Sequence, residues 1–206
     1  HKNWDSVPMH MALVFPDIYD IGVSNIGLKI LYDEINRRDD ALAERAYAPW
    51  LDMEVIMRQH NIPLYALESK RALACFDLIG VSLPYETLYT NTLNILDLAS
   101  IPVRSTERND LHPLIIAGGH ACFNPEPMNE FIDAFVIGEG EEVIHDILDV
   151  LKLLEWEVDR EVSQPASPYS RREAVLHALA QIPGMYVPRF YNVSYLPDGT
   201  IESIRP

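Results

Sequence analysis

The chain has 206 residues, 48% of them hydrophobic, which is enough for one domain of ordinary size with an appendage. The 31 acidic and 16 basic residues give a net charge of −15, which argues against direct nucleic-acid binding because Lys and Arg are needed to neutralise phosphates. No apolar run approaches the ~20 residues of a membrane-spanning helix, and the first residues lack the form of a signal peptide. We therefore expect a cytoplasmic protein with no membrane contact.

Apolar strand patterns and amphipathic helix patterns alternate along residues 10–155, after a leader at 1–9. The expected strands lie at 10–15, 43–48, 64–67, 76–83, 114–117 and 134–137, and the expected helices at 24–38, 52–60, 84–100, 127–131 and 141–154. This alternation is typical of a parallel sheet with helices on both faces. We predict an α/β domain over 10–155 with a flavodoxin-like, doubly wound sheet.

The character of the sequence changes over residues 156–206. A polar, proline-containing stretch predicts a linker, and a short helix is expected at 171–180. Alternating apolar and polar residues around Pro197, Asp198 and Gly199 predict a β-hairpin. The sequence ends just after the second hairpin strand, so we expect a further domain downstream.

Four expected strand ends carry unusual sequences, and ligands of doubly wound sheets bind at that edge. The four loops are FPDIYDIG (15–22), VSLPYE (81–86), AGGHACFNPEP (117–127) and IGEGEE (137–142). Some of these residues also have a purely structural interpretation, because Asp17 and Asp20 can cap the next helix. The GEGEE stretch has carboxylates and no Lys, which excludes a phosphate-binding loop.

Together these loops resemble the cobalamin-binding domain found in front of radical SAM (S-adenosylmethionine) enzymes. The D-x-H-x-x-G loop of that family corresponds to residues 17–22, with Tyr19 at the position of the histidine. The S-x-L element corresponds to Ser82 and Leu83 with altered spacing, and the Gly-Gly strand end to Gly118 and Gly119. The segments 12–36, 44–54, 78–102 and 123–127 are similar to the N-terminal region of one subfamily without a settled substrate.

The resemblance implies a set of cofactor-binding residues at the edge of the sheet. Ser82 and Tyr85 would contact the displaced nucleotide tail of cobalamin, and Gly118-Gly119 would leave the slot that this tail enters. A lone loop histidine such as His120 is more often a hydrogen-bonding residue than a metal ligand. The candidate residues are Asp17, Tyr19, Asp20, Gly22, Ser24, Ser82, Leu83, Tyr85, Gly118, Gly119 and His120.

The tyrosine at position 19 affects whether the protein could supply a ligand to cobalt. Imidazole binds such a metal well near pH 7, whereas a phenol, with a pKa of about 10, is a poor ligand while protonated. Two interpretations remain open. Cobalamin binds in the base-off form with no protein ligand below cobalt and Tyr19 packs under the corrin ring, or the loop is degenerate and the fold serves as a cofactor-free scaffold or interaction module.

The sequence contains two cysteines, Cys75 and Cys122, and these are too few to hold a [4Fe–4S] cluster. The resemblance therefore implies that the cluster and S-adenosylmethionine bind to a radical SAM domain downstream of Pro206. That domain would be the partner of this one and would carry out methyl transfer or another radical modification. We expect residues 1–206 alone to be non-catalytic, with no metal ligands of their own.

Overall fold

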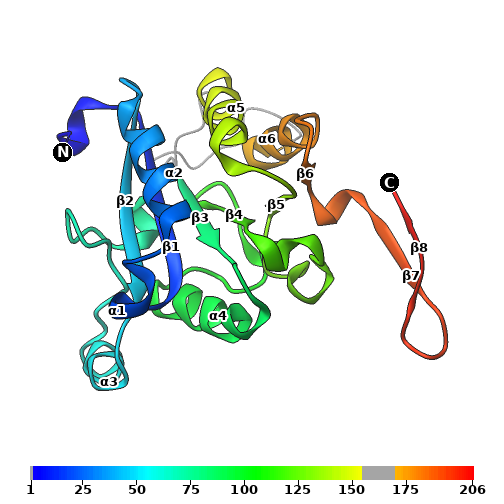
Figure 1. Cartoon of the computed structure of the whole chain (residues 1–206), viewed down its shortest axis with the longest axis horizontal. Coiled ribbons are helices and arrows are strands. Elements are labelled where there is room, and N and C mark those ends of the chain that lie inside the picture. Colours follow the sequence, from blue (N-terminus) through cyan, green and yellow to red (C-terminus); the bar gives the residue numbers. More distant parts are fainter. Residues whose placement is uncertain (1, 155–169) are drawn as a thin grey trace.

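A computed structural model describes residues 2–154 and 170–206 and places one central sheet between two layers of helices (Figure 1). The strand order is β2-β1-β3-β4-β5-β6, in which the first five strands are parallel and β6 runs antiparallel to β5. The strands are β1 (Met9–Ile18), β2 (Ala41–Ala48), β3 (Leu78–Ser82), β4 (Leu114–Gly118), β5 (Ala134–Val136) and β6 (Met185–Tyr186). The order 2-1-3-4-5 is that of flavodoxin-like sheets, so the predicted fold is confirmed.

Helices cover both faces of the sheet, as its long apolar strands require (Figure 1). One face carries α2 (Ile26–Arg37), α5 (Gly140–Leu153) and α6 (Arg171–Leu179). The other face carries α3 (Leu51–His60) and α4 (Tyr89–Leu98). A single helical turn, α1 (Tyr19–Gly22), follows β1 directly.

Local chemistry explains where several elements begin and end. The Asn25 side chain accepts a 2.8 Å hydrogen bond from the Leu28 N–H, so α2 begins two residues later than predicted. The helix expected at 127–131 is one 3₁₀ turn, Glu126–Met128, because Pro125 and Pro127 remove backbone donors. Pro16 lies within β1, where the register with β2 is irregular between Phe15 and Ile18.

The strand expected at 64–67 does not form. Tyr65 makes one isolated antiparallel bridge, to Ala72. The neighbouring N–H of Leu64 donates instead to the Leu98 carbonyl at the end of α4. An apolar run of four residues was too short a signal to distinguish a strand from a buried loop.

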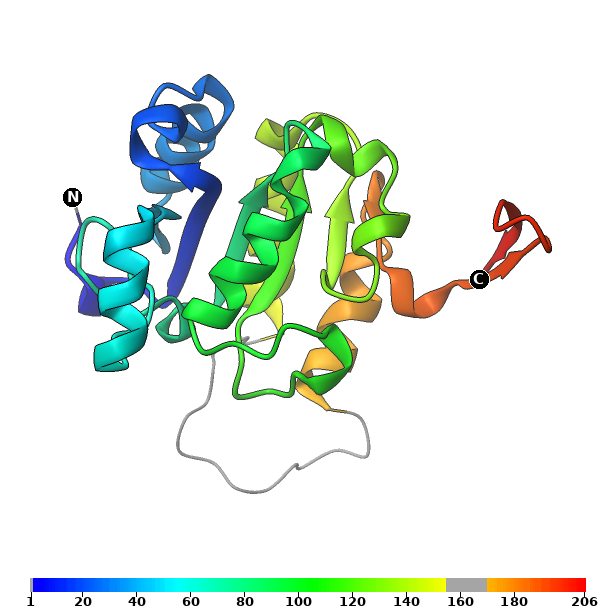
Figure 2. The same cartoon turned by 90° about the horizontal axis from the view of Figure 1, so that it is seen from below.

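The residues after the predicted linker belong partly to the sheet. The linker itself lies outside the described residues. Helix α6 packs against α5, and β6 adds a sixth strand through the pairs Phe135–Tyr186 and Val136–Met185. The predicted hairpin is present as β7 (Asn192–Tyr195) and β8 (Ile201–Arg205), and it projects away from the sheet (Figures 1 and 2).

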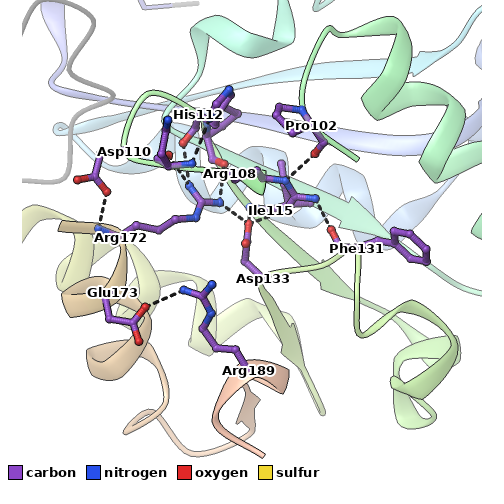
Figure 3. A network of polar contacts seen from close by, with 12 residues as sticks. Pro102, Arg108, Asp110, His112, Ile115, Phe131, Asp133, Arg172, Glu173 and Arg189 are labelled. Carbon is purple, nitrogen blue, oxygen red and sulfur yellow. Dashed lines mark hydrogen bonds and ion pairs between the residues drawn. The ribbon is translucent and has the colours of Figure 1, made fainter. Parts of the chain in front are cut away.

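A buried charge cluster attaches α6 to the amino ends of β4 and β5 (Figure 3). One oxygen of Asp133 accepts hydrogen bonds from Arg108 at 2.8 Å, from Arg172 at 2.6 Å and from the Ile115 N–H at 2.8 Å. The two guanidinium groups also donate to backbone carbonyls around them. The carboxylate of Asp110 accepts from the first N–H groups of α6 and so caps this helix.

Candidate ligand-binding site

A cavity of about 240 Å³ lies between the sheet and the helix pair α2 and α5. Its floor is formed by residues that are paired in register across the central strands. Ser82, Gly118 and Val136 form the row nearest the carboxyl ends of the strands. Gly80 and Ile116 belong to the next row, deeper in the cavity.

The floor is hollow because the two central strands place very small residues under the helices. A Cβ on Gly118 would meet no heavy atom closer than the Cβ of Val136, at 3.7 Å, so a side chain there would extend into open space. At Gly80 the corresponding space is taken by the Met11 methyl group, 2.4 Å from where a Cβ would lie. Gly80 therefore lets the flexible Met11 side chain close the inner end of the cavity.

The roof is formed by the amino-terminal parts of α2 and α5. Leu28 and Leu31 come from α2, and Ile144 and Ile147 from α5. Gly140 of α5 faces α2, and a Cβ there would lie 3.5 Å from a Leu31 methyl group, which is an ordinary van der Waals contact. The two helices therefore lie within van der Waals reach of each other over the cavity.

The opposite ends of α2 and α5 are joined by charges. Arg38, which follows α2, donates to Asp149 of α5 at 2.5 Å and to Asp40. Asp40 also accepts from Lys152 at 2.7 Å. These ion pairs hold the helices together at the end remote from the cavity mouth.

The cavity mouth lies at the carboxyl edge of the sheet and is bordered by exposed backbone and carboxylates. Gly119 has a φ of 116°, and a Cβ there would lie 2.6 Å from the Leu83 carbonyl oxygen, so this position requires glycine. Gly138 and Glu139, just before α5, are exposed on the other side. The Ser82 hydroxyl has no hydrogen-bond partner among the described residues. Beyond this polar mouth, a ligand would meet the Ser82 hydroxyl and otherwise mainly apolar walls among the described residues.

Three of the predicted site residues, Ser82, Gly118 and Gly119, line this cavity together. Leu83 supports them through its backbone, since its N–H donates to the Gly118 carbonyl at 2.7 Å and its carbonyl accepts from the Ala121 N–H. The others lie at the same edge of the sheet or in the loop after β1 but do not line the cavity. They are Asp17, Tyr19, Asp20, Gly22, Ser24, Tyr85 and His120.

The loop after β1 forms its own packed unit. Tyr19 is 49% exposed and its ring meets that of Tyr47 edge to face, with centroids 5.3 Å apart. A Cβ on Gly22 would lie 2.6 Å from the Tyr47 ring, so glycine is needed here to accommodate that tyrosine. Burial raises the pKa of Tyr47. Asp17 accepts a 2.8 Å hydrogen bond from the next N–H, that of Ile18, as expected for a carboxylate that orders its own loop.

Sequence reasoning missed the deep end and the roof of the cavity. Gly80 gave a usable signal, because glycine within a buried strand often marks a close approach of another group. Gly138 and Gly140 entered the sequence analysis only as part of the GEGEE stretch, whose carboxylates exclude a phosphate-binding loop. The contributions of Leu28 and Ile144 follow a helix pattern that is indistinguishable from ordinary core packing.

Comparison with known proteins identifies the family. Residues 27–188 match the family described as "Radical SAM proteins, N-terminal". The chain belongs to this family. The matched range includes β3, β4, α5 and most of the cavity but begins after the Tyr19 loop. The family assignment therefore rests on the part of the chain that contains most of the cavity lining.

One curated relative is much longer than the part of it that aligns with this chain. An uncharacterized protein of Methanocaldococcus jannaschii is 25% identical over 143 residues. The match covers 68% of this chain and 26% of the relative, so the aligned part corresponds to about a quarter of that longer protein. No solved structure matches the chain. None of the helices in the described residues is long and apolar enough to cross a membrane.

Proposed function

We propose that this radical SAM N-terminal domain binds cobalamin in the base-off form, with the displaced nucleotide tail in the cavity and no protein ligand below cobalt. The observation that supports this proposal is the cavity itself. It opens at the carboxyl edge of a flavodoxin-like sheet, where such folds bind their ligands. It is lined by Ser82, Gly118 and Gly119, which the resemblance assigns to the tail, whereas Tyr85, assigned to the tail as well, lies outside it.

The cavity has the size and chemistry that a flat aromatic base requires. An apolar cavity of about 150 Å³ is known to admit benzene, so 240 Å³ is sufficient for a fused two-ring base. The Ser82 hydroxyl could bond one nitrogen of that base. The carboxylates of Glu139 and Glu141 border the mouth and would repel the negatively charged phosphodiester of the tail. The free N–H groups at the start of α5 would attract the same group.

Tyr19 suits a cofactor that takes no ligand from the protein. Its ring is half exposed at the end of β1 and is held against Tyr47, outside the cavity. In the proposed complex Tyr19 packs under the corrin ring. When bound, cobalamin would supply cobalt chemistry of the kind used in methyl transfer. The iron–sulfur cluster and S-adenosylmethionine belong, in this proposal, to another domain of the whole protein.

The test is a titration of the purified domain with hydroxocobalamin and methylcobalamin, followed by absorbance and calorimetry. We expect micromolar or tighter binding with a base-off spectrum. Gly118→Val should weaken binding at least about tenfold, because overpacking a filled cavity costs about 1–3 kcal/mol. Ala174→Val, a similar change on the exposed face of α6, is the control and should bind like the unmodified domain.

A Tyr19→His variant probes the lower side of cobalt separately from the tail. It should shift the spectrum towards a histidine-ligated form. The same spectrum in both proteins would show that position 19 does not lie under cobalt.

The alternative function is that of a cofactor-free scaffold that docks onto another domain. Exposed apolar side chains at the carboxyl edge favour it, among them Tyr19, Ile21 and Tyr85, each at least 40% exposed. Absence of cobalamin binding by both the domain and the full-length protein would exclude the first function and favour this one.

A further inference from the structure

The polar groups of the cavity are too few for a purine. The deep end is closed by Met11, Leu78 and Ile147, which are at most 3% exposed, so water is largely excluded there. Gly80 adds only backbone. Among the residues that the structure describes, the hydrogen-bonding side chains at the cavity are Ser82 on the floor and the exposed Glu139 and Glu141 at the mouth. A buried base can therefore form one side-chain hydrogen bond.

We propose that the cavity selects among cobamides by their tail base, taking benzimidazole-type and phenol-type bases and rejecting adenine. This inference rests on the proposed cobalamin function. A displaced dimethylbenzimidazole exposes a single ring nitrogen, which matches the single free hydroxyl of Ser82. Its two methyl groups gain from apolar contact.

Adenine has the same ring shape but a different demand for hydrogen bonds. Besides one imidazole-type nitrogen it carries an exocyclic amine and two further ring nitrogens. The central backbone groups of the floor are already paired in the sheet, between β1 and β3 and between β3 and β4. The additional groups of adenine would lose their water without gaining partners, and each such loss is worth roughly fivefold to a hundredfold in affinity.

A phenol-type base has no nitrogen and needs no partner. Such a cobamide should bind without help from Ser82, through apolar contact alone. The three bases therefore separate the contribution of cavity shape from that of hydrogen bonding.

The experiment is calorimetric titration of the domain with four probes: cobalamin, adeninylcobamide, p-cresolylcobamide and cobinamide, which lacks the tail. We expect cobalamin to bind at least about tenfold tighter than adeninylcobamide and cobinamide, with p-cresolylcobamide near cobalamin. Ser82→Ala should weaken cobalamin several-fold and leave p-cresolylcobamide unchanged. Val136→Thr places a hydroxyl in the cavity without changing its shape and should improve adeninylcobamide binding several-fold.

The outcomes separate this inference from the proposed function. If none of the four probes binds, cobalamin binding itself is wrong. If cobinamide binds as tightly as cobalamin, the domain binds the corrin but the tail does not use the cavity. If adeninylcobamide equals cobalamin while cobinamide is weak, the tail uses the cavity without the proposed selectivity. Either of the last two results would overturn the inference.

Discussion

The buried cluster of Arg108, Asp133 and Arg172 yields a sharp prediction because its charges are unequal (Figure 3). The side chain of Arg108 is fully buried, and those of Asp133 and Arg172 are 2% exposed. Two cations share one carboxylate, and burial lowers the pKa of Arg108 despite the opposing charge of Asp133. The cluster therefore has a surplus positive charge, which the surrounding backbone carbonyls and the nearby charge of Glu107 moderate.

Asp133→Ala should be far more damaging than removal of one arginine. It leaves two buried cations without a counter-ion, at a cost of about 3–5 kcal/mol, and leaves the Ile115 N–H without its acceptor, at about 1–3 kcal/mol. Arg172→Met leaves the matched pair Arg108–Asp133 and replaces the lost side chain with apolar volume. We expect this variant to be destabilised by about 1–3 kcal/mol, through its lost carbonyl bonds.

Urea unfolding followed by circular dichroism measures both variants. A small domain has a total stability of only about 5–15 kcal/mol, so Asp133→Ala should be partly or wholly unfolded in buffer. The double variant Asp133→Ala, Arg172→Met tests the cause, because it removes one surplus cation and should recover stability relative to Asp133→Ala alone. If Arg172→Met is the more damaging single change, or the double variant recovers nothing, the charge argument is wrong.

Three further predictions concern other parts of the molecule. The hydrogen bond from Arg38 holds the pKa of Asp40 well below its usual range, so this stabilisation is present above about pH 4 and lost at lower pH. The free energy of unfolding in urea should therefore fall between pH 6 and pH 3 by up to ~1 kcal/mol more in the unmodified protein than in Asp40→Asn. Equal decreases in the two proteins would contradict this. Burial raises the pKa of Cys122 to about 12, so its thiol should stay protonated and unreactive in the folded protein at pH 8. Mass spectrometry should find Cys122 alkylated by iodoacetamide only after unfolding, and rapid labelling of the folded protein would refute this. Glu139→Gln should tighten cobalamin binding about twofold to fivefold at low salt in calorimetry, whereas Glu202→Gln on the hairpin should not, and equal effects would place the tail phosphate elsewhere.

The fold could be predicted largely from the apolar pattern. Strands with both faces covered give near-continuous apolar runs, as at β3 and β4, and the loops that follow then fall at one edge. The family resemblance assigned Ser82, Gly118 and Gly119 to one site, and the structure brings them to one cavity. Strand ends in a parallel sheet meet in space even when they are far apart in sequence.

The missed features depend on tertiary contacts. Strand β6 has two residues, too short for any periodicity, and exists because Tyr186 pairs with Phe135. Arg108, Asp133 and Arg172 are distant in sequence and each is typical of a surface. Their burial becomes favourable only when α6 brings Arg172 onto the same carboxylate as Arg108.

The cavity itself is unusual in a layer that should be close-packed. Protein interiors leave few voids larger than a water molecule, and an unfilled apolar cavity destabilises by roughly 24 cal/mol per Å³. For about 240 Å³ the penalty reaches roughly 6 kcal/mol if the cavity stays empty, and less where solvent enters at the mouth. An alanine at Gly118 would reduce this void with only an ordinary contact to Val136, yet the chain has glycine there. Glycine at position 118 thus leaves a void that a single methyl group would reduce, in a domain of marginal stability. This arrangement is expected if the proposed ligand binding is maintained at the expense of stability.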